Sequence, residues 1–374
     1  MNILAIVNGF GLGNATRCEP LFMEFAREVK PLSIDIATSG NGVAYFRGRP
    51  YVRRLVRLRS LNYGGGTTGI SLFGLLSALP RTFVSFFSNA LVIAKTLRRN
   101  DYDLVLIDSD YTALVFRIFS RVPVVAVNNS ESVIAECLRT RPPVSVWPQF
   151  LVELFDFLFH RWVPTLTLAP TLNPSTVESR AVVPIPLLSR FTSTRNRKNE
   201  PARPFRVFFM FSASELGPDP RDFIRICPRD VVVTRISKDN RANPDGSFRD
   251  VSNELQLADL IVSNAGLGTI SDAIATRTPI LVVPISGHCE QWANAKMIER
   301  LGLGEASTME TFPAKLRMIR DDYEAYREAF ERFTPRQEHS PRLAVSVVLR
   351  RLALAEPMGQ SSESHRAVTV ETNV

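Results

Sequence analysis

Short runs of β-branched residues alternate with longer segments of helical apolar spacing through the first half of the chain. This alternation is typical of a parallel α/β sheet. The predicted strands lie at residues 2–7, 33–37, 104–107, 122–127 and 165–169, and the predicted helices at 15–29 and 113–119.

The same alternation restarts after a polar interval between two prolines, Pro184 and Pro204, whose composition is typical of a linker. The second set comprises strands at 206–211, 231–235, 260–262 and 280–283, and helices at 269–275 and 291–301. The predicted fold class is therefore α/β, with two Rossmann-like parallel-sheet domains in tandem. The expected organisation is an N-terminal domain at 1–183, a linker at 184–204, a C-terminal domain at 205–340, a closing helix at 341–356 and a disordered tail at 357–374.

Two long apolar stretches, 72–97 and 151–163, fall short of the roughly 20 unbroken apolar residues that a membrane-spanning helix needs. Pro80 and Arg81 interrupt the first stretch. In the second, Glu153, Asp156 and His160 share one helical face. Both stretches predict amphipathic helices packed on a core. The alternative is that part of either face contacts lipid or an apolar acceptor.

A glycine turn at Gly9, Gly11 and Gly13 follows the first strand and opens the first helix. Such a turn lets the backbone approach a ligand, and the free N–H groups of the helix attract an anion. The third glycine of a dinucleotide fingerprint is missing, however, and no acid ends the second strand to hold a ribose. Both departures argue against a dehydrogenase.

A second strand, glycine turn and helix follow one another between residues 260 and 275. The turn can cradle a pyrophosphate through backbone N–H groups, and Thr269 adds a hydroxyl. Asp272 is predicted to face the same mouth, where its carboxylate could accept hydrogen bonds from ribose hydroxyls. Glu290 and Gln291 come after the next strand, where open α/β sheets bind ligands.

The run N-A-G-L-G-T-I-S-D-A, followed by T-P-I-L-V-V-P and G-H-C-E-Q-W-A-N-A, resembles the nucleotide-sugar site of GT-B glycosyltransferases. Within them, it is most similar to the MurG-like and UDP-glucuronosyltransferase-like group. The N-terminal run G-x-G-L-G-x-A-T-R and the segment Asp108-Ser109-Asp110-Tyr111 resemble microbial glycosyltransferase-like proteins. The resemblance covers about residues 1–305. It implies two domains facing across a cleft, with the donor nucleotide on the C-terminal domain and the acceptor on the N-terminal domain.

The resemblance also implies a role for individual residues. The diphosphate is assigned to Gly266, Leu267, Gly268 and Thr269, the ribose to Asp272, and the sugar hydroxyls to Glu290 and Gln291, while Ser212, Ser214, Asn264 and His288 complete the donor set and Gly11, Gly13 and Arg17 form the acceptor loop. The implied activity is an inverting transfer from a nucleotide-sugar, which acts as co-substrate. A UDP-sugar is the first candidate for this donor. No metal and no other cofactor is expected.

Asn14 stands where many relatives carry the histidine that serves as base, and an amide cannot take a proton near neutral pH. Asp108 or Asp110, at the end of a parallel strand, could replace it, or could cap the following helix instead. An acceptor such as a phosphate oxygen needs little help from a base. Two further alternatives are a protein that binds a nucleotide-sugar without transferring it, and an epimerase or hydrolase, which would need ionisable residues grouped around the sugar.

The 374 residues carry 45 Lys and Arg against 37 Asp and Glu, a net charge of +8. Residues 36–100 contain ten basic residues and no acidic one. Basic charge beside an apolar helix predicts an anionic membrane surface and a lipid-linked or phosphorylated acceptor, although a solvated face is the plainer alternative. Nucleic acid is not expected as a partner, because the arginines lack an interleaved aromatic platform.

The four cysteines are scattered without a CxxC pair, which argues against a disulfide framework and against a zinc site. Residues 1–8 have the pattern of a strand rather than of a signal peptide. The expected location is therefore a reducing cytoplasm, with the protein peripheral on the inner face of the membrane.

Overall fold

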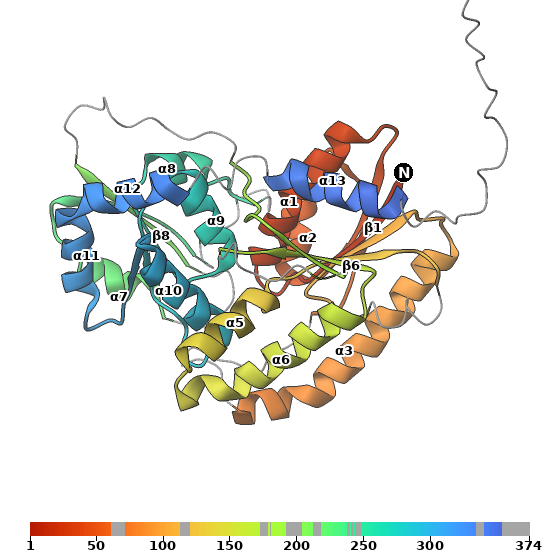
Figure 1. Ribbon diagram of the computed structural model, residues 1–374, viewed down its shortest axis with the longest axis horizontal. Helices are drawn as coiled ribbons and strands as arrows, with labels where there is room; N and C mark the ends of the chain where they lie inside the picture. The colour runs from red at the N-terminus through yellow and green to blue at the C-terminus, as the bar shows by residue number, and fades with distance from the viewer. Residues whose placement is uncertain are drawn as a thin grey trace, which may run out of the picture.

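The computed structural model describes residues 1–60, 72–112, 120–172, 179, 181–191, 204–211, 218–237, 240, 243, 248–333 and 340–353. Two α/β units stand next to each other, and a helix from the end of the chain returns to the first unit (Figure 1). This arrangement confirms the predicted fold class of two parallel-sheet domains.

Seven parallel strands form the N-terminal sheet, in the order β3-β2-β1-β4-β5-β6-β7. They are β1 (Asn2–Val7), β2 (Ser33–Thr38), β3 (Val52–Arg57), β4 (Leu104–Asp108), β5 (Val124–Val127), β6 (Leu166–Pro170) and β7 (Val182–Ile185). The order reverses between β1 and β4, so the crevice where such sheets bind ligands lies at the carboxyl ends of these two strands.

The helices of this unit cover both faces of the sheet. They are α1 (Gly13–Glu28), α2 (Gly40–Phe46), α3 (Leu72–Arg98), α5 (Ser130–Thr140), the short 3-10 helix η1 (Val144–Val146) and α6 (Trp147–Trp162). The helix predicted at 113–119 lies outside the described residues.

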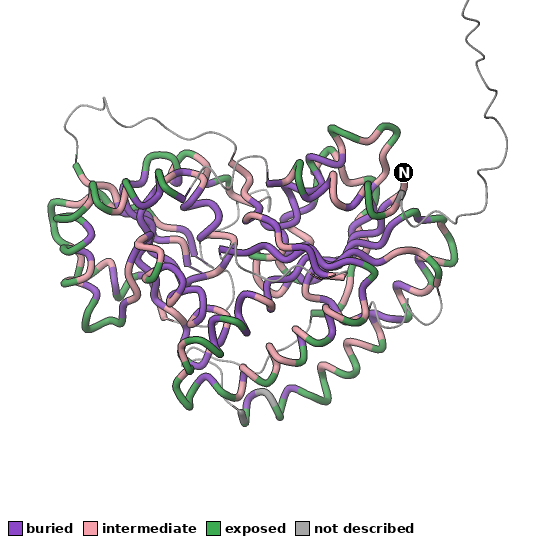
Figure 2. The backbone as a smooth tube through the Cα atoms, in the orientation of Figure 1, coloured by how far each residue is buried: buried purple, intermediate pink, exposed green. Residues whose placement is uncertain are grey.

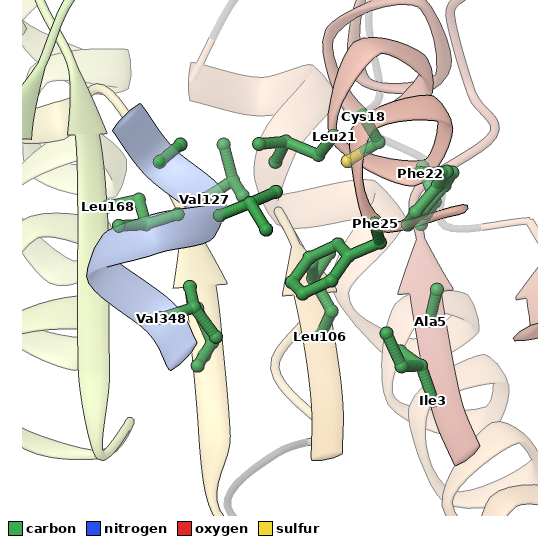
Figure 3. Close-up of a cluster of buried hydrophobic side chains, with 14 of the residues drawn as sticks. Ile3, Ala5, Cys18, Leu21, Phe22, Phe25, Leu106, Val127, Leu168 and Val348 are labelled. Atoms are coloured by element: carbon green, nitrogen blue, oxygen red, sulfur yellow. The ribbon is translucent and has the colours of Figure 1, made fainter. Parts of the chain in front are cut away.

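The main core of the N-terminal unit lies between the sheet and two helices, α1 and α13 (Ser340–Ala353) (Figure 3). Phe25 of α1 lies beside Leu106 of the sheet, and Phe22 of α1 and Val348 of α13 belong to the same core. Each fully buried side chain of this size contributes about 1.5–3 kcal/mol through removal of apolar area from water. The last helix of the described chain therefore packs on the first unit.

Five parallel strands form the C-terminal sheet, in the order β12-β11-β10-β8-β9. They are β8 (Phe205–Met210), β9 (Val231–Ile236), β10 (Leu260–Ser263), β11 (Ile280–Val282) and β12 (Gly304–Ala306). The helices are α7 (Pro220–Arg225), α8 (Ser252–Leu257), α9 (Leu267–Ala275), α10 (Cys289–Leu301), α11 (Phe312–Asp321) and α12 (Tyr323–Phe333). Here the order reverses between β8 and β10, and the second glycine turn follows β10.

One domain boundary differs from its expected position, because β7 spans Val182–Ile185 and so crosses the predicted limit at 183. Pro184 indicated a break in the sequence, but β7 is an edge strand, and an edge strand tolerates proline. Residues 192–203 of the predicted linker and the whole predicted tail lie outside the described residues.

Helices α5 and α6 of the N-terminal unit pack against α10 of the C-terminal unit, and α1 packs against α9. Val133, Cys137 and Val146 form an apolar cluster with Cys289 and Ala293 across the boundary. The Sγ atoms of Cys137 and Cys289 lie 3.4 Å apart. The two sheets are therefore held with their carboxyl ends facing a shared space.

Helix α3 is continuous through Pro80. Its segment Leu76–Arg98 is long and apolar enough to cross a membrane by length and composition. Ala90 and Ile93 nevertheless pack onto the sheet, so α3 is amphipathic as expected.

Exposed residues recur along the outward faces of α3 and α6 (Figure 2). These faces differ from those of ordinary surface helices, because many of the exposed residues are large and apolar. On α6 the polar residues Glu153 and Asp156 face inward, whereas Phe155 and Trp162 are 58% and 78% exposed. Helix α6 therefore packs on the core through Phe159, as expected, but many of its other apolar side chains are exposed. We call this outward face of both helices the apolar surface, and it consists of Phe73, Leu76, Leu79, Phe83, Val84, Phe87 and Leu91 on α3 and Trp147, Leu151, Phe155, Leu158 and Trp162 on α6.

Candidate active site

A cavity of about 290 Å³ lies between the two units and is lined by both. Its walls come from the segments that follow β1, β4 and β5 in one sheet and β8 to β11 in the other, together with the inner face of α6. Both sheets thus contribute the carboxyl ends of their strands, where open α/β sheets bind ligands. Among the residues predicted for the site, the cavity is lined by Gly11, Gly13, Asn14, Asn264, Gly266, Gly268, Thr269, His288, Glu290 and Gln291.

The two glycine turns approach each other at the cavity. A Cβ atom added to Gly268 would lie 2.9 Å from the Oγ1 of Thr16 on α1, so this position requires glycine for close packing. A Cβ atom at Gly266 would meet nothing within 4 Å, and its φ of −70° is open to any residue. Gly266 therefore leaves free space beside the start of α9.

Helices α1 and α9 both begin at this cavity without a side-chain cap among the described residues. The first turn of a helix carries N–H groups with no partner inside the helix, and its dipole favours negative charge. Neither first turn contains an acidic residue. Two uncapped helix N-termini that share one cavity form a suitable environment for a diphosphate.

Two residues other than glycine adopt the left-handed backbone at the strand ends beside the cavity. They are Ser109 after β4, with φ of 50°, and Ala265 after β10, with φ of 61°. Asn294 donates from its Nδ2 to the carbonyl oxygen of Ala265 at 2.9 Å, which helps to hold this conformation. Such strain costs about 1–3 kcal/mol and concentrates at functional sites.

Amide side chains order the loops on the donor side. The Oε1 of Gln291 accepts a hydrogen bond from the backbone N–H of Ile285 at 2.8 Å, and Asn264 donates to the carbonyl of Val283 at 3.1 Å. Leu267 differs from its neighbours, because its side chain lies in the core and is absent from the cavity wall. At Leu267, therefore, only the backbone is placed to contact a ligand.

His288 and Glu290 reach the cavity from the start of α10. Glu290 accepts a hydrogen bond from the Nδ2 of Asn129 at 3.0 Å, which joins the two units. Burial lowers the pKa of His288, and the Nδ1 atom of this histidine is buried without a hydrogen-bond partner in the described part of the chain. The imidazole is therefore neutral at pH 7.

Asp272 does not lie at the mouth of the site, contrary to the prediction. Its carboxylate accepts hydrogen bonds from Arg190 at 2.9 Å and from Ser189 at 3.4 Å, and it is absent from the cavity wall. Burial raises the pKa of Asp272, while the guanidinium opposes this effect. Arg190, which follows β7, lines the cavity instead and brings a cation to it.

Asp108 is also placed differently from the expectation, because it is fully buried beneath the first glycine turn. Arg17 donates to both of its carboxylate oxygens, and Cys18 lies 3.2 Å away. Although burial disfavours a charged guanidinium, the carboxylate raises the pKa of Arg17. Neither residue lines the cavity, so Asp108 serves as the counter-ion of Arg17 and not as a base in contact with the acceptor.

Asn14 and Asp110 complete the predicted catalytic set. Asn14 lines the cavity, and its Oδ1 accepts a hydrogen bond from Arg17 at 3.3 Å. Asp110 is buried outside the cavity wall, where it accepts from the backbone N–H of Thr112 at 2.8 Å and from the hydroxyl of the same residue. Burial raises the pKa of Asp110. Asp110 thus holds the turn at Thr112, and the helix that it was expected to cap lies outside the described residues.

The inner face of α6 supplies acidic residues that the site prediction did not include. Glu153 and Asp156 both line the cavity. Asp156 accepts from Tyr111 at 2.8 Å and from Asn128 at 2.6 Å, and His160 lies 3.3 Å from it. The sequence places Glu153, Asp156 and His160 on one helical face, and this pattern was the signal available.

Ser212 and Ser214 lie outside the described residues. Within the described ranges, no three His, Cys, Asp or Glu side chains are grouped as metal ligands. Activity without a metal therefore remains a prediction.

Two doubly wound parallel sheets that face a common cavity define the GT-B architecture. Residues 239–332 match the glycosyltransferase family 28 C-terminal domain. The chain is similar to the calicheamicin glycosyltransferase, with a TM-score of 0.63, 17% identity and coverage of 95% of this chain and 99% of that one. It is also similar to a Streptomyces glycosyltransferase complexed with thymidine diphosphate, with a TM-score of 0.61, 18% identity and coverage of 94% and 99%.

Curated relatives agree with this assignment. An uncharacterized glycosyltransferase of Methanosarcina acetivorans is 24% identical over 388 aligned residues, which cover 89% of this chain and 91% of that protein. The UDP-N-acetylglucosamine–N-acetylmuramyl-(pentapeptide) pyrophosphoryl-undecaprenol N-acetylglucosamine transferase of Geobacillus thermodenitrificans is 28% identical over 123 residues, or 30% of this chain and 34% of that protein. The chain thus has the GT-B fold, and residues 239–332 within it match the glycosyltransferase family 28 C-terminal domain.

Proposed function

We propose that the protein transfers a sugar from a nucleoside diphosphate sugar to a hydroxyl or phosphate acceptor by direct displacement with inversion. A UDP-sugar is the first candidate for the donor. The observation that carries this proposal is the cavity that both glycine turns line. The turn at Gly266–Thr269 would hold the diphosphate, and the turn at Gly11–Asn14 would face the acceptor.

Two features support a diphosphate at the second turn. The N–H groups at the start of α9 lack a side-chain cap among the described residues, and Gly266 leaves room for a ligand beside them. A structural neighbour and the spinosyn rhamnosyltransferase were both solved with thymidine diphosphate. Arg190 adds a positive charge to the same cavity and would favour an anionic ligand.

A lipid-linked acceptor fits the apolar surface. Helices α3 and α6 pack on one face of the N-terminal sheet through Ile93 and Phe159, so their outward faces belong to the same side of the molecule. Basic residues accompany these apolar side chains, since Arg81, Lys95 and Arg98 are exposed on α3. We therefore propose peripheral docking on an anionic membrane, and α3 does not span it because its inner residues are committed to the core.

The location of the protein follows from the same proposal. The name of the Geobacillus relative includes undecaprenol, a lipid carrier. All four cysteines are free thiols, which suits a reducing compartment. We propose action at the cytoplasmic face of the membrane.

A second candidate is hydrolysis or epimerisation of the nucleotide-sugar itself. The observation that favours it is the group of ionisable residues in the cavity, which includes Glu153, His288 and Glu290. The acceptor would then be water, or the sugar itself would be altered at a carbon that exchanges a proton.

Products distinguish these activities. The protein should be incubated with UDP-, TDP- and GDP-sugars and a polyprenyl phosphate in detergent, and the products analysed by mass spectrometry and NMR. Transfer predicts a glycosylated lipid with inverted anomeric configuration. Free sugar alone indicates a hydrolase, and an altered nucleotide-sugar indicates an epimerase. If no product forms from any donor, the proposed transfer is contradicted and a protein that only binds the nucleotide-sugar is favoured.

A further inference from the structure

Transfer to a hydroxyl acceptor requires a base, because the acceptor oxygen must lose its proton as it attacks the sugar. Asn14 cannot accept that proton, and both Asp108 and Asp110 lie outside the cavity wall. The base must therefore be found among other side chains. The proton acceptors that line the cavity within the described residues are Tyr111, Glu153, Asp156, His288 and Glu290.

Most of these side chains already have a partner. Tyr111 donates to Asp156, which also accepts from Asn128 and pairs with His160. In spite of burial, the charge and hydrogen bond of His160 lower the pKa of Asp156, which weakens it as a base. Glu290 accepts from Asn129 and occupies the position that the family resemblance gives to a contact with the sugar.

Glu153 is placed differently. It stands one turn before Asp156 on α6, and no described residue forms a hydrogen bond with its carboxylate that would have to be broken. Helix α6 packs against α10, whose first turn carries Glu290. Because Glu290 is expected to hold the transferred sugar, a nearby carboxylate from the acceptor unit lies where an acceptor oxygen must approach that sugar.

The electrostatic surroundings also suit a base. Burial raises the pKa of Glu153 well above its usual range, and the charges of Glu290, Asp156 and Cys137 act in the same direction. Cys289 of α10 also lies within range of the Glu153 charge. A carboxylate whose pKa is closer to the working pH takes a proton more effectively than an ordinary one.

We propose that Glu153 is the catalytic base that receives the proton of a hydroxyl acceptor, an inference that rests on the proposed transferase function. The acceptor oxygen forms a bond to the anomeric carbon of the sugar. The bond from that carbon to the diphosphate oxygen breaks, and its electron pair leaves with the diphosphate. The acceptor proton moves to a carboxylate oxygen of Glu153.

The test compares four variants by their rate of nucleoside diphosphate release. The donor is whichever UDP-, TDP- or GDP-sugar most stabilises the protein, and water and a short alkyl alcohol are the acceptors. Glu153→Gln keeps the shape of the side chain and should lower kcat by about 100-fold or more, while nucleotide affinity is unchanged. The same substitution should also abolish the fall of kcat at acidic pH, which is the acidic limb of the pH profile. Glu153→Asp should retain part of the activity.

Glu131→Gln is the matched control, because Glu131 is a partly buried carboxylate on α5 that pairs with Arg161 away from the cavity. It should keep the wild-type rate and pH profile. His288→Asn tests the other unpartnered base in the cavity. Loss of the acidic limb in this variant, or a Glu153→Gln rate within threefold of wild type, overturns the assignment of Glu153. A wild-type protein that releases no nucleoside diphosphate from any donor, either here or with the polyprenyl phosphate, overturns the proposed function, and this proposal with it.

Discussion

Arg190 donates a hydrogen bond to Asp272 at 2.9 Å and so joins the segment after β7 to helix α9 of the C-terminal unit. Both side chains are largely buried, at 11% and 3% exposure. The carboxylate of Asp272, which the sequence analysis assigns to the ribose, is therefore already engaged by Arg190. Its position suggests that Asp272 holds the two units together beside the cavity.

Replacement of Asp272 by Asn should therefore affect stability more than nucleotide binding. A buried guanidinium that loses its counter-ion costs about 3–5 kcal/mol. Urea unfolding should show this loss, whereas calorimetry with UDP should give an affinity within a few-fold of wild type. Asp222→Asn on exposed α7 serves as the control and should change neither quantity. A tenfold or greater loss of UDP affinity without destabilisation would restore the ribose-binding role.

The buried pair of Arg17 and Asp108 leads to a second prediction. Asp108→Asn should cost about 3–5 kcal/mol of unfolding free energy, because Arg17 then stays buried without its partner. The double variant with Arg17→Met should recover part of that loss in urea unfolding. If Asp108→Asn instead kept full stability and reduced kcat alone, Asp108 would be the base after all.

The raised pKa of Glu153 predicts a pH-dependent stability. A carboxyl that binds its proton more tightly in the folded state stabilises the protein below its ordinary pKa of 4.5, and this stabilisation is lost as the pH rises through the folded value. Glu153→Gln should thus match wild type near pH 4 and become the more stable protein above it, by up to about 1.4 kcal/mol per pH unit in that window. Chemical unfolding at several pH values measures this difference. A gap that does not widen with pH would contradict a raised pKa.

The apolar surface predicts binding to membranes. Wild type should float with vesicles that contain phosphatidylglycerol and less with vesicles of phosphatidylcholine alone. Phe87→Asp, at a side chain that is 63% exposed, should reduce the bound fraction about tenfold, because one buried phenylalanine contributes 1.5–3 kcal/mol. Met318→Asp on α11 is the control and should float as wild type does. Equal flotation of Phe87→Asp and wild type would exclude docking through α3.

The order of strands and helices was sufficient to place each glycine turn at the carboxyl ends of the strands of its own sheet, whereas the meeting of the two turns at one site was implied by the family resemblance. Parallel strands end on the same edge of their sheet, so the residues after β1 and β10 could be assigned from the order of strands and helices. The edge strands β3 and β7 were missed because β3 is largely polar and partly exposed, and β7 contains Pro184.

The finer geometry of the site depends on tertiary contacts that spacing does not encode. Asp272 turns toward Arg190, about 80 residues away, and the position of Arg190 depends on the path of the chain after β7. Glu153 shares a helical face with Asp156 in the sequence. Only the packing of α6 on α10 shows that this face lines a cavity instead of meeting solvent.

Binding of a nucleotide at the second glycine turn is the central claim, and thermal unfolding of wild type and Gly266→Val tests it most directly. A Cβ atom at Gly266 would meet nothing within 4 Å, so the variant should fold normally and occupy the space beside the start of α9. UDP, TDP or GDP at 100 times its Kd should stabilise wild type by about 2.7 kcal/mol and raise its Tm by several degrees. The rise in Tm is expected for wild type and should be lost in Gly266→Val. No rise with any of the three nucleotides, or an equal rise in both proteins, would contradict it.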